Sequence, residues 1–286
     1  MIAAVKSDTP DRHRTTHIPS SKESSTDGAR PLAGRHALVT GVSRRGGIGF
    51  AVAHRLATLG ARITIHGYAP HDATQLGLST DDAVDAVIDE LRGLDPDVNF
   101  IEADFADPTA AGRVVAAAVE ARGTLDILIA NHARSSENSL DDVTAEELDQ
   151  SFAVNARGSI LLAQAFAAQR EGTVHGGRIV MMTSGQHASA MPTEIAYAVS
   201  KGAIHQATRT LAAHLMHRGV TVNTVNPGPT DTGWADAETH ATIVDMMPAG
   251  RWGSPSDAAR LIAVLCGDDA AWVTGQVIDA DGGFSL

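Results

Sequence analysis

The stretch HALVTGVSRRGGIGFAVAHRLATLG, which runs from His36 to Gly60, decides the fold. It begins with a short apolar run, continues through a glycine-rich turn and ends in a stretch with helical spacing. A strand that leads into a helix is the repeating unit of parallel sheets, whose strands are joined by crossovers. Glycines at the first such junction let the backbone approach a pyrophosphate at the helix N-terminus. The stretch therefore predicts a dinucleotide site at the first strand of a doubly wound sheet.

The same alternation continues to the end of the chain. Six further apolar runs are predicted strands: RITIHG, VNFIEAD, LDILIAN, GRIVMMTS, VTVNTVNPG and GQVIDADGG. Helical stretches stand between them: DDAVDAVIDELRGL, PTAAGRVVAAAVEARG, about Thr144 to Arg170, Ile195 to Arg218, and about Pro255 to Cys266. Continuous apolar strands indicate a parallel sheet covered by helices on both faces. We expect residues 34–286 to form a single-domain, Rossmann-type α/β fold with about seven parallel strands.

Composition excludes several classes of protein. Residues 1–33 are rich in polar residues and lack an apolar period, which predicts a disordered tail. The net charge of −12 argues against nucleic acid or an anionic membrane as a partner. No apolar run approaches the roughly 20 residues that span a bilayer, and the N-terminus lacks a secretory signal. Because Cys266 is the only cysteine, no intrachain disulfide is possible, and we expect a cytoplasmic protein with Cys266 buried in a helix.

Candidate catalytic residues lie between Ser184 and Lys201. Tyr197 and Lys201 stand four apart in a predicted helix, so their side chains share one face. An ammonium near a phenol is expected to lower the phenol's pKa from about 10 towards neutrality. Lys201 is the only lysine after Lys22, although arginine is used freely, which indicates a role that a guanidinium does not fill. Ser184 follows a predicted strand and could reach the same reacting atom.

The chain from about Gly34 to Leu286 resembles the short-chain dehydrogenase/reductase family. The family's glycine motif is matched by Thr40, Gly41, Gly47 and Gly49, and its catalytic set, in order, by Asn155, Ser184, Tyr197 and Lys201. Asp104 resembles the aspartate that holds the adenine ring, and VNTVNPGPTDT the segment that closes over the nicotinamide. The C-terminal stretch GRWGSPSDAARLIAVLCGDDAAWVTGQVIDADGG resembles the family's ending nearly throughout.

The resemblance implies an NAD(P)(H)-dependent oxidoreductase that interconverts a ketone and a secondary alcohol. Ser184 would hydrogen-bond the carbonyl oxygen and Tyr197 would deliver the proton. Lys201 would hold the ribose, and Asn155 would position a water. The implied cofactor-binding residues are Gly41, Ser43, Arg44, Arg45, Gly47, Ile48, Gly49, Asp104, Phe105, Asn131, Tyr197, Lys201, Pro227, Gly228, Thr230 and Thr232. No metal is expected, because no carboxylate or cysteine pattern accompanies the histidines.

Two departures from the family pattern stand out. The glycine loop is two residues longer than usual, and the family's Asn-Asn-Ala-Gly is replaced by Ala130, Asn131, His132 and Ala133. His132 could be structural, substrate-facing or both. The second predicted strand ends in His66, Gly67 and Tyr68, with no acid to repel a ribose phosphate. Because Arg44 and Arg45 could bind that phosphate, NADP(H) is favoured over NAD(H).

The substrate is expected between residues 185–193 and 229–250. Ser184, His187, Met191 and Trp234 are its predicted contacts, with Ile243, Met246 and Met247 beside them. A 3-oxoacyl thioester and a secondary-metabolite ketone both remain open. An acidic carrier protein would need a basic surface, which Arg178, Arg209 and Arg218 could supply.

Other classes of function are carried as alternatives. Some enoyl reductases of the family have a lengthened glycine loop, but the four-residue step from Tyr197 to Lys201 argues against them. A non-catalytic cofactor sensor or scaffold would be expected to lose part of the catalytic set. The resemblance also implies a homodimer or homotetramer through the helices at about Thr144–Arg170 and Ile195–Arg218.

Overall fold

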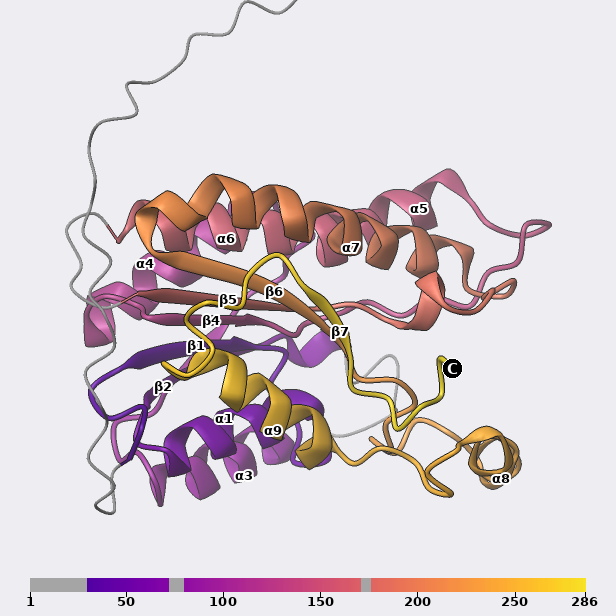
Figure 1. Cartoon of the computed structure of the whole chain (residues 1–286), viewed down its shortest axis with the longest axis horizontal. Helices are drawn as coiled ribbons and strands as arrows, with labels where there is room; N and C mark the ends of the chain where they lie inside the picture. The colour runs from indigo at the N-terminus through magenta and orange to yellow at the C-terminus, as the bar shows by residue number, and fades with distance from the viewer. Residues whose placement is uncertain (1–29, 72–79, 171–175) are drawn as a thin grey trace, which may run out of the picture.

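Seven parallel strands form one sheet in the order β3-β2-β1-β4-β5-β6-β7 in the computed structural model (Figure 1). The structure describes residues 30–71, 80–170 and 176–286. The strands are β1 (His36–Thr40), β2 (Arg62–Gly67), β3 (Asn99–Glu102), β4 (Ile127–Ala130), β5 (Gly177–Met182), β6 (Val220–Asn226) and β7 (Val277–Asp279). Strand order reverses between β1 and β4, which places a ligand crevice outside their carboxyl ends. The predicted Rossmann-type α/β class is confirmed.

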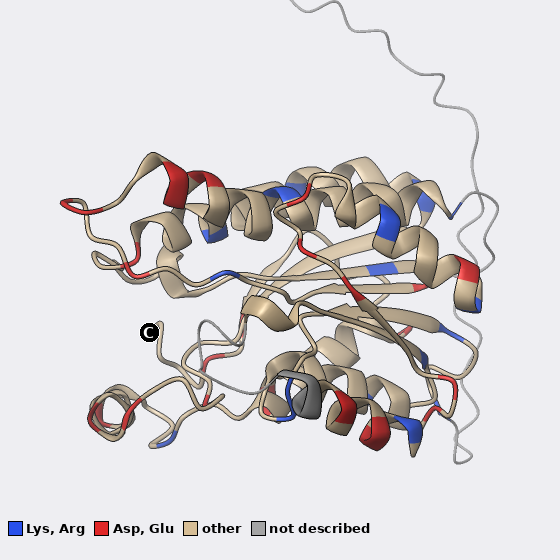
Figure 2. Ribbon diagram, turned by 180° about the vertical axis from the view of Figure 1, so that it is seen from behind, with Lys and Arg blue, Asp and Glu red and all other residues tan. Residues whose placement is uncertain are grey.

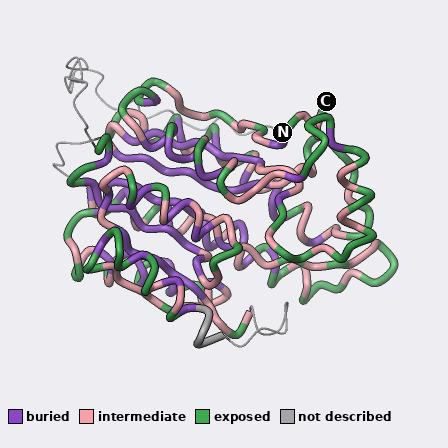
Figure 3. The backbone as a smooth tube through the Cα atoms, turned by 90° about the horizontal axis from the view of Figure 1, so that it is seen from below, coloured by how far each residue is buried: buried purple, intermediate pink, exposed green. Residues whose placement is uncertain are grey.

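Helices cover both faces of the sheet. Figure 1 shows α1 (Ile48–Thr58), α3 (Thr80–Arg92) and α9 (Pro255–Cys266) below it, with α4 (Ala110–Arg122), α6 (Gly158–Ala168) and α7 (Ile195–Leu215) above it. Successive strand residues point to opposite faces. Val39 therefore joins the core under α1 and α9, whereas Leu38 joins the core under α4 and α6. The five inner strands are buried along most of their length, whereas the edge strands β3 and β7 are only partly buried (Figure 3).

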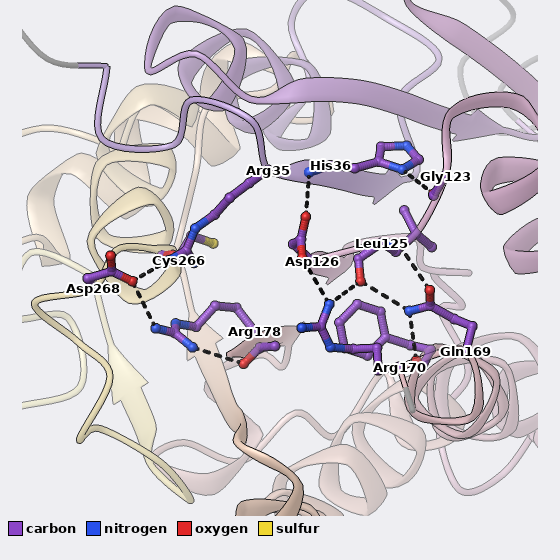
Figure 4. Close-up of polar contacts among 12 residues, drawn as sticks. Arg35, His36, Gly123, Leu125, Asp126, Gln169, Arg170, Arg178, Cys266 and Asp268 are labelled. Atoms are coloured by element: carbon purple, nitrogen blue, oxygen red, sulfur yellow. Dashed lines mark hydrogen bonds and ion pairs between the residues drawn. The ribbon is translucent and has the colours of Figure 1, made fainter. Parts of the chain in front are cut away.

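Arginines at the amino ends of the strands satisfy the carbonyl groups that end α9. Arg35 donates to Cys266 O at 3.1 Å (Figure 4), and Arg178 Nε donates to Gly267 O at 3.3 Å. Both guanidinium groups also bond to Asp268. Cations are favourable at a helix C-terminus, where four carbonyls lack intrahelical partners. These hydrogen bonds and ion pairs of the buried arginines hold α9 against β1 and β5, at the end of the sheet away from the crevice. Cys266 beneath them is fully buried, as predicted.

The helix predicted from Thr144 to Arg170 exists, with one interruption. It comprises α5 (Ala145–Ser151), a π-helical turn at Phe152–Arg157 and α6. Turns of this kind are frequent at functional sites. Two apolar residues of the predicted subunit interface, Phe152 in this turn and Val199 on α7, are about half exposed. Dimerisation through these helices stays a prediction.

The ends of the domain and one helix differ from expectation. A disordered tail was predicted for residues 1–33, and residues 1–29 of it lie outside the described residues. Leu32, which was assigned to this tail, is instead buried in the core, and its N–H donates to Leu59 O at 3.0 Å. A helix that the sequence did not predict, α8 (Ala237–Met246), lies within the predicted substrate segment. In the described ranges, every helix is too short or too polar to cross a membrane.

Candidate active site

A cavity of about 860 Å³ lies at the carboxyl ends of the strands. Its walls come from the glycine loop after β1, the loops after β2 to β6, the first turn of α7, α8 and the C-terminal residues Phe284 and Ser285. The volume lies within the range of small-molecule and cofactor sites. Most of the predicted cofactor residues line it: Gly41, Ser43, Arg44, Gly47, Ile48, Asp104, Phe105, Asn131, Tyr197, Pro227, Gly228, Thr230 and Thr232.

The glycine loop fits the pyrophosphate of a dinucleotide. Gly41 has φ +72°, a left-handed conformation that favours glycine. Asn131 holds the loop, since its side-chain amide donates to Thr40 O and Gly41 O at 3.0 and 3.1 Å. Helix α1 begins after Gly47 with no side-chain cap and no acidic residue in its first turn. Its N-terminus at the cavity therefore keeps N–H groups available for an anion.

Gly49 lies outside the cavity lining and serves the packing of the loop. A Cβ added there would lie 2.2 Å from Gly41 O and 2.7 Å from Asn131 Nδ2. We expect Gly49→Ala to displace the loop and weaken NADP(H) binding at least roughly tenfold, because a backbone oxygen cannot move without distorting the turn. Titration of intrinsic fluorescence with NADPH measures this effect. Gly112→Ala is the matched control, because a Cβ there meets open space on α4; equal weakening in both variants would contradict the role of Gly49.

The adenosine end of the cavity is marked by a buried histidine. His66 Nε2 lies 2.9 Å from Ala103 O, so Nε2 carries the hydrogen. Nδ1 is then an acceptor, and it has no partner among the described residues although it is buried. Burial lowers the pKa of His66 to about 4, so the ring is neutral. A buried acceptor without a partner costs free energy, and His66 lies in the wall of the cavity.

The two loop arginines lie in different places. Arg44 lines the cavity and bonds to Thr232 O on its opposite side. Arg45 points away from it: its Nε pairs with Glu90 at 2.9 Å, and Nη2 donates to Ala86 O at 3.1 Å, both on α3. Arg45 is thus outside the site that the sequence assigned to it, because α3 offers it a carboxylate. Of the two arginines predicted to bind the cofactor, Arg44 alone lines the cavity.

Ser184, Tyr197 and Lys201 meet at the inner wall. The Ser184 hydroxyl hydrogen-bonds the Tyr197 side chain, and both residues line the cavity. The Lys201 Nζ atom lies 5.6 Å from the centroid of the Tyr197 ring and donates to Met182 O at 3.0 Å. Lys201 is 2% exposed, so it lies behind the phenol and not in the lining. The structure therefore brings together the three groups that the sequence selected.

The expected direction of the tyrosine pKa is wrong. Burial raises the pKa of Tyr197 to about 12, and the Glu194 charge raises it further, against the Ser184 hydrogen bond. Burial also lowers the pKa of Lys201 to about 8. Desolvation disfavours the charged form of both groups. The sequence placed the ammonium beside the phenol but could not show that Lys201 is buried and that the phenol is largely desolvated.

Asn155 positions the backbone around this wall. It lies in the π-helical turn, fully buried, and its Nδ2 donates to Ser200 Oγ at 2.8 Å and to Arg134 O at 2.9 Å. Its Oδ1 accepts from Arg134 N at 2.7 Å. The side chain thus joins α7 to the loop after β4. Its predicted role with a water stays a prediction, and it does not line the cavity.

His132 is structural. Its Nε2 lies 3.1 Å from Val154 O and its Nδ1 lies 2.7 Å from Thr40 Oγ1, so Nε2 donates and Nδ1 accepts. The ring packs on Phe105 at 4.3 Å and is buried, which holds its pKa well below the usual range. His132 thus connects the glycine-loop strand to the π-helical turn, and it also lines the cavity, so a contact with the substrate stays a prediction.

The outer wall is apolar and partly formed by α8. Met191, Trp234, Ile243 and Met246 line it, whereas Met247 is buried beneath it. Helix α8 has no buried residues of its own. It is held by Trp252, whose ring stacks on His240 at 4.9 Å and whose Nε1 donates to His240 O at 2.9 Å.

His187, a predicted substrate contact, is absent from the lining. Its Nε2 pairs with Asp279 at 3.1 Å and its Nδ1 lies 3.2 Å from Ser184 O. The carboxylate at the end of β7 attracts the imidazole away from the cavity.

Comparison with known proteins decides the family. A family model described as enoyl-(acyl carrier protein) reductase matches residues 41–285. The chain belongs to the short-chain dehydrogenase/reductase family. An uncharacterised oxidoreductase, YjdA of Bacillus subtilis, is 38% identical over 250 residues, which cover 87% of this chain and 96% of that protein. Versicolorin reductase stcU of Emericella nidulans is 35% identical over 278 residues, which cover 91% of this chain and 98% of that protein.

Solved structures of the family agree with this fold. A short-chain dehydrogenase from Burkholderia cenocepacia, in complex with NADP, is 35% identical with a TM-score of 0.79. The match covers 90% of this chain and all of that chain.

Several lining residues of this short-chain dehydrogenase/reductase were missed in the sequence. Arg134, Glu137 and Glu194 line the cavity, as do Phe284 and Ser285. The position of Glu194, three residues before Tyr197, was a usable signal, because residues three apart on a helix are neighbours. The C-terminal pair carried no such signal. Within the described ranges, no three His, Cys, Asp or Glu residues gather as metal ligands.

Proposed function

We propose that this protein is an NADP(H)-dependent carbonyl reductase that interconverts a ketone and a secondary alcohol. The observation that carries the proposal is the meeting of Ser184, Tyr197 and Lys201 at one wall of the cavity. A hydroxyl and a phenol that both line the cavity can bond one carbonyl oxygen, which is the position where negative charge develops during reduction. The nicotinamide supplies the hydride when it is bound.

Each protein group has a defined part in this scheme. The Tyr197 phenol, with its pKa near 12, is protonated at neutral pH and is ready to donate to the carbonyl oxygen. Ser184 keeps the phenol oriented and donates to the same oxygen. Lys201 supplies an ammonium behind the phenol and stabilises negative charge on it. The uncapped start of α1 and the Gly41 turn bind the pyrophosphate.

The preference for NADP(H) is supported by charge at the adenosine end. Strand β2 ends in Gly67, so no carboxylate stands where a ribose phosphate would be repelled. Of the two loop arginines, Arg44 is the one that lines the cavity, and a guanidinium suits a phosphate. The Burkholderia relative solved with NADP is consistent with this choice.

The loop arginines allow a matched test of function and cofactor choice. Wild-type protein should oxidise NADPH in the presence of aromatic and aliphatic ketones, more efficiently than NADH. Arg44→Ala should raise the KM for NADPH roughly tenfold or more with little change for NADH, because a charge-assisted phosphate contact is lost. Arg45→Ala should leave the ratio unchanged, since Arg45 pairs with Glu90. Initial rates at 340 nm measure all three proteins.

The outcomes of this test separate the alternatives. Cofactor binding without turnover of any ketone would favour the sensor or scaffold reading. A preference for NADH that Arg44→Ala does not alter would contradict the assignment of Arg44. Reduction of a conjugated double bond, with the ketone left intact, would favour enoyl reduction, the activity in the description of the matching family model.

A further inference from the structure

Two carboxylates stand together on the cavity wall beside Tyr197. Glu137 and Glu194 both line the cavity. Backbone contacts hold their segments side by side, since Ile195 N donates to Asn138 O at 3.0 Å and Asn138 forms a bridge with Glu194. Burial and the charge of Glu137 together raise the pKa of the Glu194 carboxyl. The pair therefore concentrates negative charge within the cavity already described.

Arg134, a basic residue of the same cavity, is paired with another carboxylate. Arg134 lines the same wall, but its Nε and Nη2 donate to Glu147 at 3.2 and 2.7 Å. Within residues 30–71, 80–170 and 176–286, the carboxylates of Glu137 and Glu194 make no ion pair or side-chain hydrogen bond. Glu194 is partly buried and Glu137 is exposed, so a cationic ligand that pairs with both offsets the cost of burying the Glu194 charge. The pair lies in a ligand cavity next to the reacting groups, so the substrate is the natural partner.

The segments around the mouth of the cavity, α5 and α8, are also negatively charged. Figure 1 places α5 and α8 at one end of the molecule, and Figure 2 shows acidic segments on both. Exposed acids stand before and on α5, and around α8: Asp141, Asp142, Glu146, Asp149, Asp231, Asp236, Glu238 and Asp245. A cleft lined by one sign of charge attracts the opposite sign and repels its own. Acidic carrier proteins and carboxylate substrates are therefore disfavoured at this mouth.

We propose that the Glu137–Glu194 pair selects ketones that carry an ammonium group and rejects carboxylates and acidic acyl thioesters. This inference rests on the proposed function, because the carbonyl is placed at Ser184 and Tyr197 and the ammonium at the pair. Glu194 is the N-cap of α7, three positions before Tyr197, and its charge raises the pKa of the Tyr197 phenol.

The ammonium also acts on the proton donor. The charge of Glu194 raises the pKa of Tyr197, so a cation beside Glu194 offsets that effect and makes the phenol a better acid. Cationic ketones should thus gain in kcat as well as in KM. A purely diffuse attraction by the rims would act on KM alone.

Three para-substituted acetophenones test the inference. Para-(aminomethyl)acetophenone, para-ethylacetophenone and para-(carboxymethyl)acetophenone share one ring and differ in charge. With wild-type protein and NADPH, kcat/KM should fall roughly tenfold at each step from ammonium to neutral to carboxylate. The ratio of the first two ketones should shrink in high salt, since salt screens the partly exposed charges.

Variants distinguish the pair from the acidic rim. Glu194→Gln and Glu137→Gln should each reduce the ammonium preference several-fold and relieve the discrimination against the carboxylate. Glu146→Gln removes the same charge from an exposed position on α5, outside the lining, and should leave the ratios unchanged. Equal effects of all three variants, or equal rates for all three ketones in wild-type protein, would overturn the inference.

Failure of the inference can be told from failure of the proposed function. Calorimetry with NADP⁺ present measures the affinities of the same three ketones without turnover. If no ketone is reduced but the ammonium compound binds best and Glu194→Gln removes its advantage, the reductase proposal fails and the pair stands. If the neutral ketone is reduced but the binding order is flat or reversed, the reductase stands and the pair does not select charge.

Discussion

Tyr197→Phe should lower kcat for ketone reduction by a factor of at least about a thousand. The phenol is the proposed proton donor at the wall of the cavity, and phenylalanine keeps its ring while removing its hydroxyl. The Ser184 hydroxyl remains, but serine has no neighbouring base to take its place. NADPH binding should change little, because the glycine loop and α1 hold the pyrophosphate. Single-turnover rates, with NADPH affinity from fluorescence, separate these two effects.

The chain supplies a natural control, since Tyr68 is its only other tyrosine. Tyr68→Phe removes a hydroxyl at the adenosine end of the same cavity. Its single-turnover rate should match that of the wild type once NADPH is saturating. Substantial reduction by Tyr197→Phe, with unchanged stereochemistry of the alcohol, would show that another group donates the proton.

Lys201→Met should abolish most of the activity while making the fold more stable. Methionine fills a similar volume without a charge, so the phenol loses the ammonium that stabilises its ionised form. Burial lowers the pKa of Lys201 from 10.5 to about 8, which corresponds to about 3 kcal/mol at 1.36 kcal/mol per pKa unit. The lost hydrogen bond to Met182 O offsets about 1 kcal/mol. A net gain of roughly 2 kcal/mol is expected at neutral pH in urea unfolding.

The pH dependence of this gain has a defined sign. Below about pH 8 the lysine is charged in both folded and unfolded protein, so folding bears the full cost of burial. Between about pH 8 and 10.5 the folded lysine is neutral while the unfolded one is still charged, and the cost falls as pH rises. Lys201→Met should thus be most stabilising at pH 6–8 and should lose its advantage by about pH 10.5. An advantage that stays constant across this range would show that the ammonium is not desolvated.

The sheet and the catalytic wall were predictable because their signals are local. Continuous apolar strands between helices specify a parallel sheet, and β1 has the predicted bounds, His36 to Thr40. Tyr197 and Lys201 share a helix, so their spacing alone placed them together. Ser184 joined them because the carboxyl ends of parallel strands meet at one edge of the sheet.

The remaining features depend on contacts between distant segments. The sequence placed Arg45 and His187 in the cavity because they lie in loops that line it. Instead, Arg45 pairs with Glu90 on α3, and His187 pairs with Asp279 at the end of β7. The pKa direction of Tyr197 depends on how far the wall excludes water, which no local pattern reveals. Helix α8 was missed because none of its residues is buried, so it lacks the apolar stripe of a core-packed helix.

The way α8 is attached has an evolutionary consequence. Since the cores lie on the sheet and the helix contributes no buried residue to them, exchange of residues 237–246 leaves the folding free energy of the domain nearly untouched. Selection on substitutions in this segment therefore acts mainly through which molecules can enter the cavity. Trp252, which contacts His240 of α8, would hold a replacement helix in the same place. Grafting this segment from a relative is accordingly a direct way to redirect the catalyst towards new ketones.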